Sequence, residues 1–320
     1  MGLIGRKDGK TKAGLFIFGG VMQYLVLSKQ GAKSYKVEEC IDVPYDIGTA
    51  GGELFSSQEL VEDNLKTLKK HVGRHWANKV CVGIQSKDVL LRTVELPKMD
   101  LADLKDSFRY EFDRFFPIPV DEAVYDVALV ERPKLDDPVQ DAICQCIAVA
   151  VRNSTVENLM MAANRIGLKL NCIEPSPVAL LRCLMGPVPP SGYNIYALAG
   201  IVSSIIVATY KDNGIVFRNT AQSFAADDPS GNNIGAFARD LQATIKFATT
   251  QMRGFDADKI YVGGYGLTQS RAMKASMEET ASSPVEFVNP WETWGISNQP
   301  KQIYGWEVVI GLALRSSEVK

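Results

Sequence analysis

The sequence GLFIFGGVMQYLVL, at residues 14–27, predicts a strand, a tight turn and a second strand, with Gly19 and Gly20 at the turn. Continuous apolar runs of this length are typical of buried strands, and glycine tolerates the backbone angles of a tight turn. Residues 195–210, IYALAGIVSSIIVATY, repeat the pattern with small residues at the turn. Both halves of the chain thus begin with a β-meander and continue as alternating helices and strands, which predicts an α/β protein, and many α/β folds share this pattern.

Apolar periodicity and turn residues predict the other elements. Asp100 should cap a helix, and Pro117 and Pro119 should end it, because proline moves the preceding residue out of the helical region. The linker is expected at residues 186–192, GPVPPSG. Strands are expected at residues 34–43, 80–84, 89–96, 125–130, 142–151, 169–173, 214–219 and 259–262. Two helices are expected to begin at Ser57 and after Asp100, and further helices are expected at residues 154–166, 177–184, 234–252, 267–280 and 311–315.

The composition is that of an ordinary globular protein, with 320 residues, 46% hydrophobic and 22% charged. A net charge of -2 gives no electrostatic reason to expect nucleic acid as a partner. Without a signal peptide or a run of about 18 apolar residues, a cytoplasmic protein is expected. The six cysteines lack metal-site spacing, so free thiols are expected, with Cys144 and Cys146 on one face of a strand.

Four groups of segments follow one another in a characteristic order. They are VLLRTVELPKM at 89–99; FPIP at 116–119 with Glu122 and Asp126; VAVRN at 149–153 with RIGL at 165–168 and ALLR at 179–182; and VGG at 262–264 with NP at 289–290 and GLALR at 311–315. Their order and spacing cover almost the whole chain. Together they resemble PilM, the actin-like cytoplasmic component of type IV pilus assembly machines.

This resemblance implies an actin-like (ribonuclease-H-like) two-lobed fold similar to FtsA. The first lobe would cover 1–190, with an inserted 1C-type subdomain at about 97–175. The second would cover 191–320, with a helical subdomain at about 219–258. Members of the family usually bind ATP between the lobes.

The resemblance also implies a partner. Members hold the cytoplasmic tail of an inner-membrane protein, PilN, in a groove beside the inserted subdomain, and other pilus assembly components are further candidate partners. The protein would then be peripheral to the inner membrane through that partner. The candidate groove residues are aromatic, and core packing is their alternative role: Phe108, Phe112, Phe115 and Phe116.

Actin-like ATP sites use two Asp-x-Gly hairpins, in which glycine admits the phosphates and aspartate orients Mg²⁺. Here the first aspartate position holds Phe16 or Ile17, and the second holds Leu198 or Ala199. Apolar groups offer Mg²⁺ no oxygen, so we expect no catalytic residues, no metal site and no ATP turnover. Residual binding of ATP would use the turns and small residues that remain: Gly19, Gly20, Gly200, Ser203, Gly263, Gly264 and Gly266.

Two other motifs are interpreted structurally. DIGTAGG at 46–52 resembles a phosphate loop but lies between a strand and a helix, so we expect a glycine-rich connector. His71 and His75 have the spacing of a metal pair, but Gly73 between them indicates a helix end. Beside the non-catalytic scaffold, three functions stay open: an actin-like ATPase, the cytoplasmic domain of a GspL-like type II secretion protein, and an FtsA-like filament former.

Overall fold

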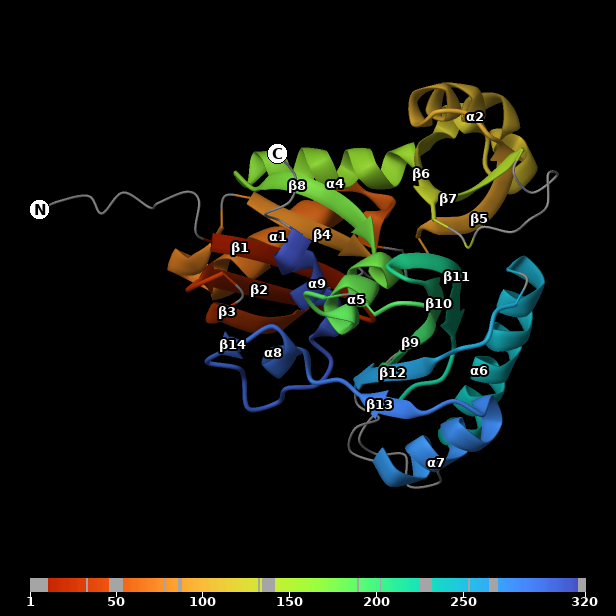
Figure 1. Cartoon of the computed structure of the whole chain (residues 1–320). Coiled ribbons are helices and arrows are strands. Elements are labelled where there is room, and N and C mark those ends of the chain that lie inside the picture. The colour runs from red at the N-terminus through yellow and green to blue at the C-terminus, as the bar shows by residue number, and fades with distance from the viewer. Residues whose placement is uncertain are drawn as a thin grey trace, which may run out of the picture.

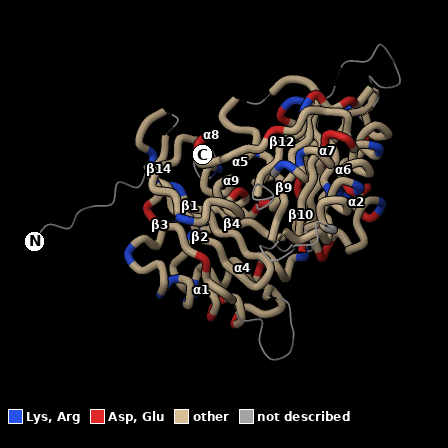
Figure 2. Tube along the Cα trace, turned by 90° about the horizontal axis from the view of Figure 1, so that it is seen from below, with Lys and Arg blue, Asp and Glu red and all other residues tan. Residues whose placement is uncertain are grey.

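The computed structural model describes two lobes and a smaller subdomain (Figure 1). Among the residues that the structure describes, no helix is long and apolar enough to cross a membrane. Figure 2 shows basic and acidic residues interspersed along both lobes. The residues described are 11–32, 34–45, 54–77, 79–85, 88–131, 133, 142–188, 190–201, 203–224, 232–252, 254–264 and 270–315.

The first lobe is built on a six-stranded sheet of order β14-β3-β2-β1-β4-β8. β1, β2 and β3 form the expected antiparallel meander, and β4 and β8 add in parallel. Gly19 and Gly20 make the first turn with φ angles of 49° and 85°. The strands are β1 (Thr11–Phe18), β2 (Val21–Lys29), β3 (Tyr35–Pro44), β4 (Lys79–Ile84), β8 (Lys169–Pro175) and β14 (Ile296–Ser297).

Helices cover both faces of this sheet, as the alternating directions of the β1 side chains require. Leu15 and Ile17 point into one core with α1 (Gln58–Val72) and α4 (Asn153–Arg165). Phe16 points into the other core, which contains α5 (Ser176–Met185) and α9 (Glu307–Arg315). That second core also takes in residues of the second lobe, so it joins the two lobes.

The second lobe has a five-stranded sheet of order β11-β10-β9-β12-β13. Its outer face is covered by α6 and α7, which pack together around Phe237, Leu241 and Met273 (Figure 1). α6 therefore belongs to the core of this lobe. The elements are β9 (Tyr193–Ala199), β10 (Ser204–Tyr210), β11 (Asn213–Thr220), α6 (Asn232–Gln251), β12 (Lys259–Gly264), α7 (Ser270–Ala281), β13 (Val285–Phe287) and α8 (Pro290–Thr293).

The inserted subdomain is a three-stranded sheet of order β5-β7-β6 with α2 packed on it. Asp100 caps α2 as expected, because its side chain accepts a hydrogen bond from the Asp103 amide at 2.9 Å. The Thr93 hydroxyl donates to the Ile215 carbonyl, so the subdomain also touches the second lobe. The elements are β5 (Leu90–Pro97), α2 (Leu101–Phe115), β6 (Ala123–Val130) and β7 (Ile143–Arg152).

Two packing arrangements bear on the domain limits expected from the sequence. The three-stranded sheet covers residues 90–152, whereas β8 pairs with β4 and α4 packs on α1 in the first lobe. The end of the chain returns to the first lobe, where α9 packs on β1 and α5. This approach is close: a Cβ at Gly311 would lie 1.9 Å from the Ala179 carbonyl oxygen.

The expectation of six free thiols is wrong for Cys81 and Cys172, which form a disulfide. They stand opposite each other on the adjacent parallel strands β4 and β8. A sequence separation of 91 residues explains why spacing gave no signal. The expectation for Cys144 and Cys146 is confirmed, since their Sγ atoms lie 3.7 Å apart on one face of β7.

Candidate functional site

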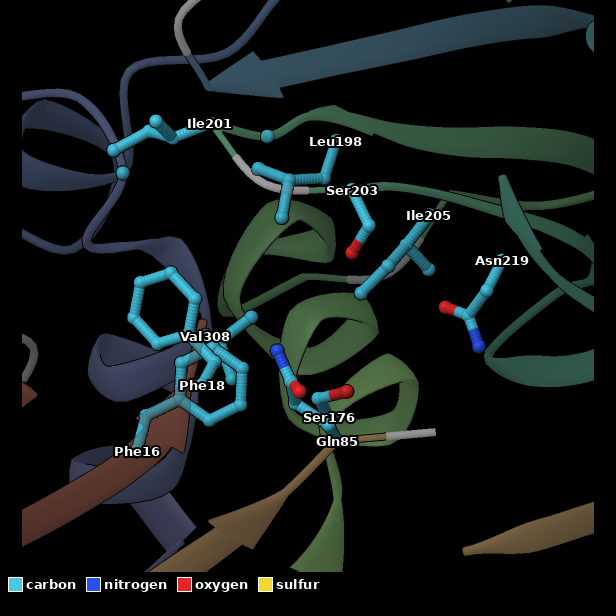
Figure 3. Close-up of a pocket in the computed structure, with 12 residues that line it drawn as sticks. Phe16, Phe18, Gln85, Ser176, Leu198, Ile201, Ser203, Ile205, Asn219 and Val308 are labelled. Atoms are coloured by element: carbon cyan, nitrogen blue, oxygen red, sulfur yellow. The ribbon is translucent and has the colours of Figure 1, made fainter. Parts of the chain in front are cut away.

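A cavity of about 270 Å³ lies between the lobes, at the ends of the two hairpins (Figure 3). Its walls come from both sheets and from the N-terminal ends of α5 and α9, so closure of the lobes would change its shape. The lining residues are Phe16, Phe18, Gln85, Ser176, Leu198, Gly200, Ile201, Ser203, Ile205, Asn219, Gly305 and Val308.

The structure resolves which residues stand in the two aspartate positions. Phe16 and Leu198 line the cavity, whereas Ile17 and Ala199 point into the outer cores of their lobes. The Phe16 ring stacks on Phe18 with centroids 4.5 Å apart. Among the described lining residues none carries a charge, so the cavity offers Mg²⁺ no carboxylate and phosphate no cation.

Some of the small residues of the predicted nucleotide site lie close together, since Gly263 and Gly264 pair with Leu198 and Ala199, next to Gly200. Gly200 and Ser203 line the cavity, whereas Gly19 and Gly20 serve the β1–β2 turn. Gly266 and the motif at residues 46–52 lie outside the described residues.

Gly263 and Gly264 end β12 in a crowded setting. A Cβ at Gly263 would lie 2.7 Å from Leu184 Cδ2, and one at Gly264 would lie 2.4 Å from the Ala199 carbonyl oxygen. Atoms of the chain itself therefore fill the space beside both glycines. The Gly264 amide, which a nucleotide could otherwise approach, donates a hydrogen bond to Glu307 Oε1 at 2.7 Å.

Glu307 is the residue that sequence reasoning missed. It is the first residue of α9 and only 1% exposed, and its Oε2 has no hydrogen-bond partner in the part of the chain described. Burial raises the pKa of this carboxyl from 4.5 to about 7, while hydrogen bonds from its own amide and those of Gly264 and Gly305 act in the opposite direction. A single acidic residue in the apolar run WEVVIGLALR was the available signal.

The aromatic residues of α2 lie mainly inside the inserted subdomain. Phe108, Phe112 and Phe116 are 0%, 0% and 3% exposed, and only Phe115 is partly exposed. In this conformation they stabilise α2 against the three-stranded sheet and do not form the rim of a groove.

The two histidines lie on either side of a helix end. α1 ends at Val72, and Gly73 follows it with a φ angle of 57°. His71 Nδ1 lies 2.8 Å from the Thr67 carbonyl oxygen within the helix, whereas His75 belongs to the next turn. The interpretation of this segment as a helix end is confirmed.

Two hairpin-led lobes around an interlobe cavity define a protein of the actin-like class. Within that class, the sequence model of the family described as type IV pilus assembly protein PilM matches residues 18–220. The match covers more than half of the chain, so the chain belongs to the PilM family. A comparison with curated protein sequences finds no match.

Solved structures share the fold over the full length. A chain of a PilM–PilN type IV pilus biogenesis complex is 19% identical with a TM-score of 0.69, covering 97% of this chain and 98% of that one. A Bacteroides thetaiotaomicron protein of actin-like ATPase fold is 10% identical with a TM-score of 0.53, covering 98% and 99%. The cytoplasmic domain of EpsL, an inner-membrane component of the type II secretion system of Vibrio cholerae, is 11% identical with a TM-score of 0.50, covering 97% and 94%. At these identities the likeness concerns the fold.

Proposed function

We propose that this protein is a non-catalytic scaffold of type IV pilus assembly. It binds the cytoplasmic tail of a PilN-like inner-membrane protein and is peripheral to the membrane through that partner. The observation that carries the non-catalytic role is the uncharged lining of the interlobe cavity, where Phe16 and Leu198 replace the two carboxylates. Mg-ATP does not fit such a lining, since its phosphates and its metal ion would lose water without gaining ionic partners.

A pilus partner is favoured over the other candidates by the family match and by the fold shared with the PilM–PilN complex. The likeness to the EpsL domain supports the same fold but adds no second function. An ATPase of this fold is the competing function, and it would need charged groups that the described lining lacks.

The tail is expected to dock along β6 of the inserted subdomain. β6 is an edge strand, paired among the described strands only with β7, so its outer backbone groups can pair with an added strand. Val124 and Leu129 on β6 are 47% and 43% exposed. β6 begins beside the N-terminal end of α4 (Figure 1), whose Met160 and Met161 are also exposed. Val124 and Leu129 lie on opposite faces of β6, so successive residues of an added strand would point toward each face in turn.

Fluorescence anisotropy with a labelled peptide of the membrane partner's cytoplasmic tail tests the docking site. Val124→Asp should weaken binding by about tenfold or more, because it places a charge where apolar contact is proposed. Phe247→Asp is the matched control, since Phe247 is 52% exposed on α6 of the second lobe. Equal affinities of the two variants would exclude β6 as the docking strand, and no binding by the wild type would refute the scaffold role.

A further inference from the structure

The interlobe cavity contains polar groups that the protein itself does not satisfy. Gln85, Ser176, Ser203 and Asn219 come from four separate segments of the chain and line one space. Within the described part of the chain, none of their side chains takes part in a hydrogen bond. A mostly apolar cavity into which a few polar side chains converge is typical of a ligand site.

These four side chains line one cavity from both lobes. Ser176 is 2% exposed, at the start of α5, and Gln85 follows β4 beside it (Figure 3). The Ser203 hydroxyl points into the space from the opposite side, and the exposed Asn219 lies on the second-lobe side (Figure 3). Amides and hydroxyls each donate and accept, so the matching ligand carries both a donor and an acceptor.

The remaining walls set the charge and size of the ligand. They are apolar, with aromatic rings from Phe16 and Phe18 and aliphatic groups from Leu198, Ile205 and Val308. No described lining residue is charged, so an anion would find no cationic partner among them. A volume of about 270 Å³ exceeds that of a cavity that binds benzene, about 150 Å³, and falls just below drug-sized sites.

We propose that this cavity binds a small uncharged aromatic compound that bears an amide or hydroxyl group. The ring packs against the apolar wall and the polar group bonds to Gln85 and Ser176. The inference goes beyond the scaffold role and does not depend on where the tail docks. It assigns the cavity to a ligand other than a nucleotide.

Three probes of similar shape separate the effect of ligand charge on affinity from the effect of hydrogen bonding. They are benzamide, its anionic analogue benzoate, and toluene, which has no polar group. Saturation-transfer NMR on the full-length protein should show benzamide binding with a dissociation constant on the order of 1 mM, as expected for a ligand of this size. Benzoate should bind at least about tenfold more weakly, because its charge would be buried without a partner. Toluene should also bind more weakly, because it leaves the polar groups unpaired.

Variants locate the binding. Gln85→Met with Ser176→Ala should weaken benzamide binding at least about fivefold, whereas Gln242→Met, an exposed change on α6, should leave it unchanged. Absence of benzamide binding, benzoate binding as tight as benzamide, or unchanged affinity in the double variant would each overturn the proposal. Tail-peptide binding measured on the same samples separates this outcome from failure of the scaffold role, and circular dichroism verifies that the double variant is folded.

Discussion

Replacing Glu307 with glutamine tests the buried carboxyl beside the glycine turn. The glutamine side chain keeps an oxygen that can accept the Gly264 amide, which lies 2.7 Å from Glu307 Oε1. It removes only the ability to ionise. Any pH-dependent difference between the two proteins therefore reports the ionisation of this one carboxyl.

The expected magnitude follows from the change in pKa on folding. The Glu307 carboxyl has a pKa of about 7 in the folded protein, against 4.5 for the unperturbed group. The folded state binds the proton more tightly than the unfolded state. The contribution of this carboxyl to the free energy of unfolding is therefore fully present below pH 4.5 and is lost as the pH rises through 7. At about 1.4 kcal/mol for each pKa unit, the loss amounts to about 3 kcal/mol.

Urea unfolding at pH 4.5, 6, 7 and 8 measures this loss. The free energy of unfolding of the wild type should fall relative to Glu307→Gln by about 3 kcal/mol between the first and last pH. Glu279→Gln, an exposed change on α7, is the control and should follow the wild type. Parallel pH profiles for the wild type and Glu307→Gln would refute the account of Glu307 as a buried, destabilised carboxylate.

Three further changes test packing and covalent structure. Gly311→Ala should cost about 3 kcal/mol of unfolding free energy in a urea titration, since its Cβ would lie 1.9 Å from the Ala179 carbonyl oxygen; a loss below 1 kcal/mol would contradict this packing. Phe112→Ala should cost about 3 to 5 kcal/mol and expose the inserted subdomain to limited proteolysis, because Phe112 is fully buried; an unchanged digestion pattern would argue against its core role. Mass spectrometry after alkylation of unfolded, unreduced protein should find Cys81 and Cys172 unmodified and the other four cysteines labelled, whereas six labelled cysteines would exclude the disulfide.

The parts of the fold that local sequence governs were predictable. The turn at Gly19 and Gly20 and the helix cap at Asp100 depend on neighbouring residues, and the structure confirms both. Comparison with the Asp-x-Gly hairpin pattern also limited the aspartate positions to two candidates each. One candidate of each pair points toward the cavity. For the first pair, the side of the sheet that α5 and α9 cover decides which one, and only the structure shows that it is Phe16.

Features that join distant segments were not predictable from spacing. The partners of Glu307 and of Cys81 lie 43 and 91 residues away in sequence, at Gly264 and Cys172, and they meet only through sheet order and helix packing. The apolar period of α2 correctly predicted a helix but could not distinguish a core from a groove. The structure places Phe112 in the core because the three-stranded sheet covers that face.

Binding and hydrolysis of Mg-ATP test the central claim most directly. Isothermal titration calorimetry with and without Mg²⁺, together with a phosphate-release assay on the same wild-type protein, measures both. A non-catalytic scaffold with an uncharged cavity should show no micromolar binding of Mg-ATP and no phosphate release above the buffer rate. Micromolar, Mg²⁺-dependent binding or sustained turnover would contradict it.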